Sequence, residues 1–268
     1  MFESIVVPLD LEAGGDRALP IAGALARGAG VTLELITVSS PGMSEEFDLY
    51  DLSQRARSTG AASTTRVLHG NNVADTILSF VDDRPNPLVV MGTRARGPLG
   101  EYFLGSVSEA VLTSATDPVL LVGPRTDIDE PSPTPTLVIA VDGFAAATAL
   151  APAVTAWVES FGGPPPWMVE VAPDEGDEDA GDSSPGRRLG DLLDGRGITV
   201  EWEVSQDRRP VDALVDFADH VADAVLAVAS SRWTDPRPRF TSTARKLTQQ
   251  AHHPVLVVPV RDAGDGAP

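Results

Sequence analysis

The chain has 268 residues, enough for one large domain or two of ordinary size, and 42% of them are hydrophobic, as in a typical globular protein. Its formal net charge is −19, from 20 basic and 39 acidic residues. A surface this acidic repels nucleic acid and anionic membranes, so the composition argues against both as partners. Cysteine is absent, which excludes disulfides and thiolate metal sites.

The sequence also predicts where the protein resides. No apolar run approaches the roughly 20 residues that a membrane span needs, and the opening MFESIVVPLD lacks a basic leader. We therefore expect a soluble, cytoplasmic protein. Aspartate outnumbers glutamate, and Lys246 is the single lysine. This composition resembles that of proteins from organisms with molar internal salt, which makes a halophilic protein our compositional hypothesis.

Strand and helix patterns alternate through the first 124 residues. Short apolar or β-branched runs predict strands, and segments with apolar residues at helical spacing predict helices. Gly28 and Gly30 are expected to end the first helix, and Asn72 to cap the third. The expected strands are 4–9, 31–38, 62–68, 88–91 and 119–122, and the expected helices are 18–27, 47–59, 73–81 and 106–115.

The same order of elements then repeats. SIVVPLD at 4–10 recurs as TLVIAVD at 136–142, and PVLLVGP at 118–124 recurs as PVLVVPV at 254–260. Two copies of a unit of roughly 130 residues are the simplest account. The expected division is a first domain at 1–125, a Pro-rich linker at 126–135, a second domain at 136–261 and a disordered tail at 262–268.

The second copy contains one strongly polar segment, after the expected strand at 167–171. Residues 173–184 are rich in acidic residues, Gly and Ser, have no apolar face, and are expected to form a mobile loop. A calcium-binding loop is the alternative, but the EF-hand spacing is absent. The expected strands of this copy are 136–141, 167–171, 198–204, 224–228 and 255–258, and the expected helices are 145–160, 189–193, 211–221 and 241–251.

Alternating βα units predict the α/β class, with a doubly wound parallel sheet and right-handed crossovers in each copy. Ligands of such sheets bind outside the carboxyl ends of the strands, at the switch point between strands 1 and 4. Asp10 ends the first strand, Val38 the second and Met91-Gly92 the fourth, so we expect them to converge. The alternatives are an ordinary turn aspartate at Asp10 and core packing at Val38 and Met91.

A glycine-bearing loop, 93–104, joins the fourth strand to a helix that begins at Gly105-Ser106. The first N–H groups of a helix have no internal partner, and the helix dipole makes that end positive. A strand, a glycine loop and a helix start can therefore bind an anion such as a phosphate. An ordinary βα turn is the alternative that spacing alone leaves open.

This stretch resembles the C-terminal signature of the universal stress protein family. The nucleotide-binding branch carries Gly, two residues, Gly, nine residues, and then Gly-Ser or Gly-Thr. The segments SVSEAVL and DPVLLV, which follow the signature, also resemble the family. Ala95 stands where the second glycine is expected, while the spacing matches throughout. At the signature positions the chain has Gly92, Thr93-Arg94, Ala95, a run of nine residues, and Gly105-Ser106.

The resemblance implies a fold and a ligand. The family fold is Rossmann-like (adenine nucleotide alpha hydrolase-like), with five parallel strands in the order 3-2-1-4-5. The ligand is ATP or AMP, with or without Mg²⁺; the strand-1 aspartate bonds the ribose, and a hydrophobic residue at the end of strand 2 packs on the adenine. The implied site residues are Pro8, Leu9, Asp10, Val38, Met91, Gly92, Arg94, Gly105, Ser106 and Val107.

The second copy departs further from the signature. Ala229 and Arg232 replace the two glycines, Thr241-Ser242 replaces Gly-Ser, and the loop is shorter by one residue. We therefore predict that this copy binds no nucleotide and has a structural or interaction role. Its basic residues could receive an anionic partner or the acidic surface of another chain, or could be solvated. They are Arg232, Arg237, Arg239, Arg245 and Lys246.

The favoured interpretation is a tandem universal stress protein that responds to adenine nucleotide. Family members often pair through their last strands, so PVLLVGP and PVLVVPV are expected to join edge to edge, in an internal pseudo-dimer or a homodimer. A non-nucleotide-binding interaction module is the second hypothesis, and Ala95 favours it. An enzyme such as a nucleotidyl transferase is the third; we expect no enzyme beyond slow ATP hydrolysis, because no phosphate-loop motif or metal-binding spacing is found.

Overall fold

The computed structural model describes residues 1–11, 15–39, 45–93, 105–141, 143–171, 184–205, 209–230 and 243–260. We call the elements up to β5 the N-terminal half and those from β6 the C-terminal half. The N-terminal half contains β1 (Ser4–Pro8), η1 (Gly15–Arg17), α1 (Ala18–Ala29), β2 (Thr32–Ser39), α2 (Glu45–Ser58), β3 (Ser63–His69), α3 (Val73–Asp82), β4 (Pro87–Gly92), α4 (Ser106–Ser114) and β5 (Val119–Val122).

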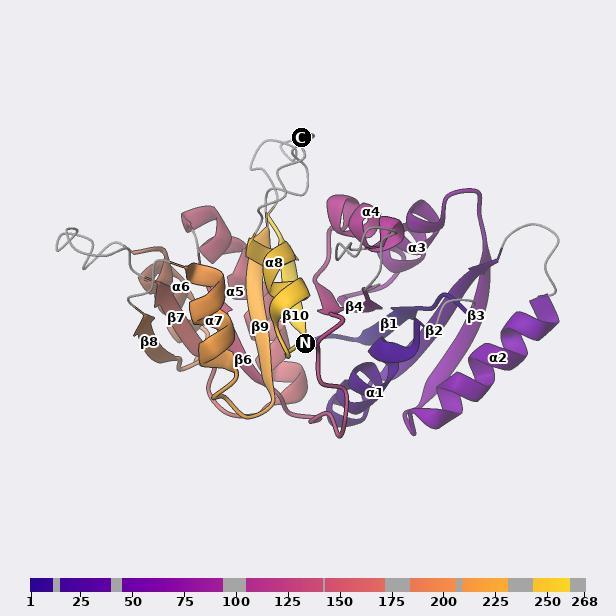
Figure 1. Ribbon diagram of the computed structural model, residues 1–268, viewed down its shortest axis with the longest axis horizontal. Coiled ribbons are helices and arrows are strands. Elements are labelled where there is room, and N and C mark those ends of the chain that lie inside the picture. Colours follow the sequence, from indigo (N-terminus) through magenta and orange to yellow (C-terminus); the bar gives the residue numbers. More distant parts are fainter. Residues whose placement is uncertain are drawn as a thin grey trace.

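The C-terminal half repeats this alternation of strands and helices (Figure 1). Its elements are β6 (Thr136–Ala140), α5 (Phe144–Phe161), β7 (Trp167–Val171), α6 (Pro185–Asp194), β8 (Glu201–Ser205), α7 (Pro210–Ala218), β9 (Ala224–Ser230), α8 (Thr243–Gln250) and β10 (Val255–Pro259).

All strands belong to one ten-stranded sheet, in the order β3-β2-β1-β4-β5-β10-β9-β6-β7-β8. Within each half the neighbouring strands are parallel, and the order counted from the first strand of that half is 3-2-1-4-5 in both. The predicted fold class, a repeated doubly wound α/β unit with this strand order, is therefore confirmed.

The two halves meet at the last strand of each. β10 pairs with β5 in the antiparallel direction, with Leu256 opposite Leu120, so the hydrogen-bonded ladder continues from one half into the other. The expected edge-to-edge contact between PVLLVGP and PVLVVPV is present within one chain. Because the pairing is antiparallel, the carboxyl ends of the strands lie on opposite edges of the sheet in the two halves.

Helices cover both faces of the joined sheet, as Figure 1 shows. Buried side chains of α1, α2, α5 and α6 form one hydrophobic cluster with one face. Those of α3, α4, α7 and α8 form a second cluster with the other face. Each cluster contains residues of both halves, so neither core is confined to one copy.

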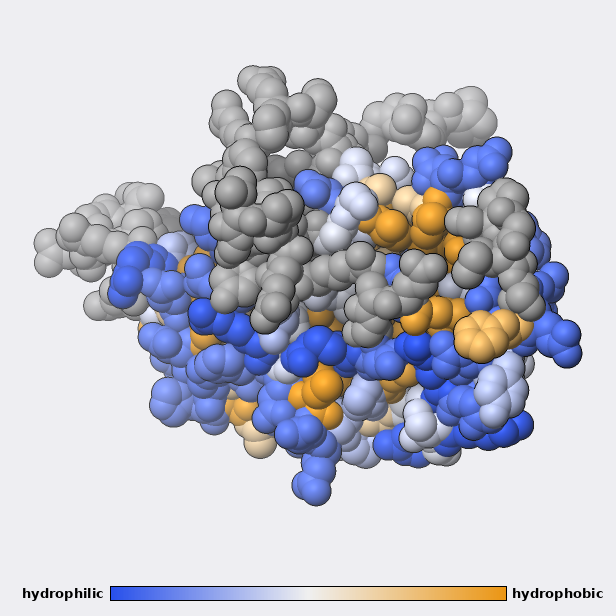
Figure 2. Space-filling view, turned by 45° about the vertical axis from the view of Figure 1, so that its right-hand side comes forward, coloured by the Kyte–Doolittle hydropathy of each residue, from blue (hydrophilic) through white to orange (hydrophobic). Residues whose placement is uncertain are grey.

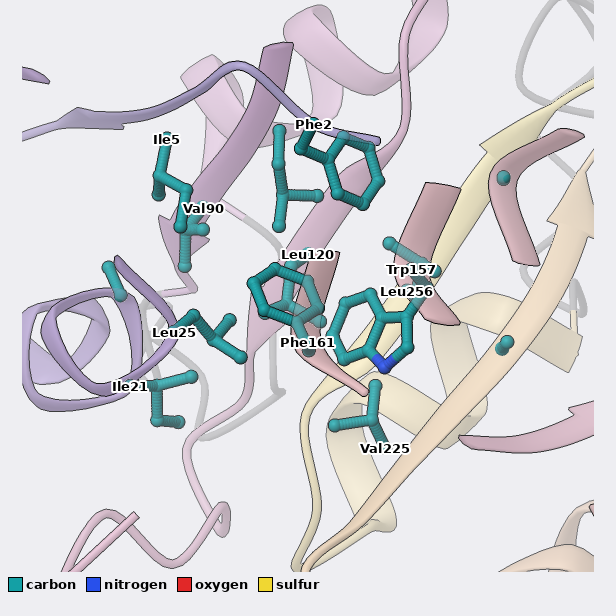
Figure 3. Close-up of a cluster of buried hydrophobic side chains, with 14 of the residues drawn as sticks. Phe2, Ile5, Ile21, Leu25, Val90, Leu120, Trp157, Phe161, Val225 and Leu256 are labelled. Carbon is teal, nitrogen blue, oxygen red and sulfur yellow. The ribbon is translucent and has the colours of Figure 1, made fainter. Parts of the chain in front are cut away.

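An aromatic contact reinforces the junction on the first face (Figure 3). The ring of Phe161 lies 4.7 Å from that of Trp157 and 6.0 Å from that of Phe2, measured between centroids. The backbone N–H of Phe2 also donates to the hydroxyl of Ser160 over 2.7 Å. The first residues of the chain are thus packed against the end of α5, in the other half.

Several elements differ from their expected bounds, among them α7, which ends at Ala218 instead of 221. Gly28 lies inside α1 rather than ending it; Gly30, with φ of +66°, is the C-cap. α6 begins at Pro185 instead of 189, because Ser184 caps it by accepting a hydrogen bond from the N–H of Arg187. β8 begins at Glu201 instead of 198. The predicted cap at Asn72 is confirmed.

Helix α5 is long and apolar enough to cross a membrane by length and composition, the single such helix among the described residues. Half of its 18 residues are buried within the molecule, where they contribute to the first hydrophobic cluster. The core of the fold therefore accounts for its apolar character. Among the residues drawn in colour in Figure 2, hydrophilic ones predominate, with smaller apolar patches between them.

Candidate functional site

The end of β1 forms the first part of the candidate site. Pro8 is paired with Ile36 of β2, and the N–H of Leu9 donates to the Ile36 carbonyl over 2.8 Å, which extends the ladder past the strand end. The buried hydroxyl of Thr37 donates to the Leu9 carbonyl over 2.9 Å. Asp10 follows with an exposed side chain. If the β1–β2 register continues for two residues beyond the pair of Pro8 and Ile36, Asp10 lies opposite Val38.

The ends of β2 and β4 flank this position on either side. Val38 is half-buried and is paired with Leu68 of β3. Met91 is 5% exposed, and Gly92, half-buried, ends β4 opposite Val122 of β5. Because β1, β2 and β4 are parallel neighbours, their carboxyl ends lie at the same edge of the sheet.

Helix α4 begins at this same edge. It carries the chain from the carboxyl end of β4 back to the amino end of β5, which is parallel to β4. Gly105 occupies its N-cap position and has no side chain to accept a hydrogen bond from the first turn. Ser106 is exposed, while Val107 is half-buried against the second hydrophobic cluster. The first N–H groups of α4 are therefore available at the helix start.

The topology thus brings most of the predicted site residues together. Asp10, Val38, Met91, Gly92 and the start of α4 all lie at the carboxyl edge of the N-terminal half. We call this the carboxyl-edge cluster; its residues are Pro8, Leu9, Asp10, Val38, Met91, Gly92, Gly105, Ser106 and Val107. Arg94, Ala95 and the rest of the loop to 104 lie outside the described residues.

Arg55 is a residue of this region that the sequence interpretation missed. Its side chain, 17% exposed, forms an ion pair with Asp51 on the same helix and with Asp16 in η1. Its guanidinium also donates to the carbonyl of Leu11 over 3.2 Å. The hydrogen bond with Asp51, followed by the charges of both aspartates, raises the pKa of Arg55. Arg55 therefore anchors α2 to the residue directly after Asp10.

A local signal for part of this arrangement was present in the sequence. Asp51 and Arg55 stand four residues apart on a helix, the spacing at which opposite charges pair. Nothing in that spacing indicated that the same guanidinium would also reach Leu11 and Asp16, which are about 40 residues earlier.

The equivalent edge of the C-terminal half is described only in part. β6 ends at Ala140, β9 at Ser230, and α8 begins at Thr243. Asp142 and residues 231–242, which include Arg232, lie outside the described residues, so the prediction of a loop that cannot hold nucleotide stays a prediction.

Within the described ranges, no cluster of three or more His, Asp or Glu side chains could hold a metal ion. His252 and His253 both approach Asp219, at 3.5 and 2.9 Å. These residues lie near the amino end of β10, which the antiparallel pairing puts at the same edge of the sheet as the carboxyl end of β5; the N–H of Asp127 donates to the carbonyl of His252 there, over 2.8 Å.

Comparison with known proteins identifies the family. The model of the universal stress protein family matches residues 1–123. The "Universal stress protein in QAH/OAS sulfhydrylase 3'region" of Thermus aquaticus is 31% identical over 136 residues, which are 46% of this chain and 99% of the relative. The crystal structure of a universal stress protein from Archaeoglobus fulgidus shares the fold, with a TM-score of 0.69 and 17% identity over 97% of this chain and 99% of that one. The chain belongs to the universal stress protein family.

Proposed function

We propose that the N-terminal half binds an adenine nucleotide, ATP or AMP, and that the protein acts as a nucleotide-responsive stress or signalling protein. The observation that carries the proposal is the carboxyl-edge cluster. An exposed aspartate at the end of β1 and the uncapped start of α4 stand at one edge of one sheet. The resemblance of Gly92, Gly105 and Ser106 to the signature of the family's nucleotide-binding branch supports a nucleotide as the ligand.

Each part of the cluster suits a different part of the nucleotide. The first N–H groups of α4 point along the helix axis and suit phosphate oxygens, since the dipole adds positive charge at that end. The carboxylate of Asp10 can accept hydrogen bonds from ribose hydroxyls. Val38, half-buried beside it, offers apolar surface for a base. Gly92 has no side chain to obstruct the approach.

Ala95 is the residue that limits the affinity. A left-handed backbone at this position would cost alanine about 1–2 kcal/mol relative to glycine. Since each 1.4 kcal/mol is a tenfold change in dissociation constant, the affinity would fall by roughly 5- to 30-fold. Arg94 could restore part of the lost affinity through a charge-assisted hydrogen bond to a phosphate. We therefore propose weakened binding rather than none.

We propose that the C-terminal unit spans residues 136–261 and is joined to unit 1–125 by the linker. This unit is proposed to bind no nucleotide. Its role in this proposal is structural. β10 completes the sheet beside β5, and α5 supplies the aromatic contact with Phe2. The unit thereby holds the last strand of the ligand-binding half in a fixed place.

Titration calorimetry with ATP and AMP tests the proposal. We expect measurable binding by the wild type, tighter binding by Ala95→Gly, and loss of at least tenfold in affinity for Asp10→Ala. Asp142→Ala removes the equivalent acid of the second copy and is the matched control, so its affinity should equal that of the wild type. Repeating the titration with EDTA shows whether Mg²⁺ contributes. The absence of heat for both wild type and Ala95→Gly would refute the proposal.

An interaction module that binds no nucleotide is the second candidate function, and the alanine at position 95 favours it. The two are separated by denaturing the purified protein and analysing the supernatant by chromatography. Released AMP or ATP supports the nucleotide site. No nucleotide, together with no change in melting temperature on adding ATP, supports the interaction module.

A further inference from the structure

Helices α4 and α8 occupy equivalent places in the two copies. Residues 106–124 align without a gap with residues 242–260, an offset of 136 positions. The buried positions of the two helices correspond under this offset. These equivalent buried pairs are Ser108 and Ala244, Val111 and Leu247, and Leu112 and Thr248.

The junction between the halves is organised about a local two-fold axis. At such an axis a residue of one copy faces its own equivalent in the other, and the flanking pairs are exchanged. The offset of 136 positions makes Leu256 the equivalent of Leu120, and the two are paired directly. The register pairs are Leu120 with Leu256, Val119 with Val257, and Leu121 with Val255.

A charged pair lies at a second self-facing position. Glu109 on α4 and Arg245 on α8 are equivalent under the same offset, and they contact each other. One terminal nitrogen of the Arg245 guanidinium lies 3.4 Å from each carboxylate oxygen of Glu109. The Arg245 side chain is 14% exposed and that of Glu109 is 44% exposed.

The charges at this position distinguish the pairing of an N-terminal with a C-terminal half from the pairing of two identical halves. If two N-terminal halves paired through the same surface, Glu109 would face a second glutamate. If two C-terminal halves did so, Arg245 would face a second arginine. The self-facing leucines on β5 and β10 make no such distinction, because an apolar residue packs equally well against its own kind.

We propose that the Glu109–Arg245 pair selects the pairing of the N-terminal with the C-terminal half over the pairing of two like halves. Like charges held together oppose the wrong partner, while opposite charges favour the right one. This also assigns a role to Arg245, a member of the basic cluster found in the sequence: its acidic partner belongs to the same chain. The inference does not depend on nucleotide binding.

Variants of the full chain reproduce each arrangement at the axis. Glu109→Arg places an arginine opposite Arg245, as in a pairing of two C-terminal halves. Arg245→Glu places a glutamate opposite Glu109, as in a pairing of two N-terminal halves. The double variant restores opposite charges in exchanged positions. Glu201→Arg and Arg188→Glu make the same changes in net charge at exposed positions on β8 and α6 and serve as matched controls.

Thermal unfolding followed by circular dichroism is the readout. Each single variant should melt about 2–5 °C below its charge control, and the double variant within about 1 °C of the wild type. In 1 M KCl, where the Debye length is about 3 Å, the deficits of the single variants should shrink. The proposal is overturned if both single variants melt with their controls, or if the double variant loses as much as the two single variants together.

Discussion

Replacing Phe161 by alanine tests whether the two halves unfold as one unit. Phe161 is the last residue of α5 and is 3% exposed. Its ring contacts Trp157 in its own half and Phe2 in the other, as Figure 3 shows. The surrounding hydrophobic cluster crosses the junction between the halves, since it contains both Leu120 of β5 and Leu256 of β10. A cavity at Phe161 should therefore weaken both halves together.

The expected loss follows from burial and from the two ring contacts. Truncating a buried phenylalanine to alanine costs about 3–5 kcal/mol, through lost transfer energy and the cavity that remains. Each aromatic pair adds about 0.5–1.5 kcal/mol beyond its area, which favours the upper part of that range. Since 1 kcal/mol moves the melting temperature of a chain of this size by about 2–4 °C, we expect a decrease of roughly 6–20 °C.

The distribution of tryptophan supplies the assay. All four tryptophans, at positions 157, 167, 202 and 233, lie in the C-terminal half, whereas far-ultraviolet circular dichroism reports helices of both halves. Phe144, on the same helix and 55% exposed, provides the matched control, because Phe144→Ala should leave the melting temperature almost unchanged. If the fluorescence midpoint falls while part of the dichroism signal melts at the wild-type temperature, the halves are independent and the reasoning is wrong.

Three further predictions concern stability. Arg84 and Glu34, both 15% exposed, form a bidentate ion pair with N–O distances of 2.8 Å. Arg84→Gln leaves the carboxylate of Glu34 without this partner and should lower the free energy of unfolding, measured in urea, by about 3 kcal/mol. The double variant Glu34→Gln/Arg84→Gln should lose less than Arg84→Gln alone. A side chain at Gly123 would place its Cβ 2.1 Å from the backbone carbonyl oxygen of Thr248, so Gly123→Ala should lower the melting temperature by at least 2 °C, about 1 kcal/mol or more. The halophile hypothesis predicts a higher melting temperature in molar KCl than in 0.1 M KCl, and equal values would contradict it.

The elements that depend on local sequence were predictable. Asn72 caps α3 as expected, because its side chain bonds N–H groups only two and three residues away. The end of β4 at Met91-Gly92 followed from an apolar run bounded by glycine, whereas β1 ends at Pro8, two residues before the expected Asp10. Parallel topology then fixed their common edge, and that inference needs only the order of the elements.

Features that depend on residues far apart in the chain were not predictable. Gly28 was expected to end a helix, yet it lies within α1, where a Cβ would approach the carbonyl oxygen of Pro133 to 2.3 Å. Glycine is required at this position because the backbone of Pro133, about 100 residues later, packs closely against it. Arg55 and Arg245 likewise bind partners on other elements, and a helical charge pattern alone does not specify such partners.

Joining two copies in one chain changes what a substitution can do at the two-fold axis. In a dimer of identical chains, any change at a self-facing position occurs on both sides, so an opposite-charge pair cannot arise there. In the tandem chain each copy can change alone, and Glu109 and Arg245 are such a divergent pair. The same freedom extends to the loops that precede α4 and α8: the second copy has Ala229 and Arg232 at the two signature glycine positions, while β10 still completes the sheet beside β5. Divergence of the loop and complementarity at the axis are therefore two consequences of one covalent connection.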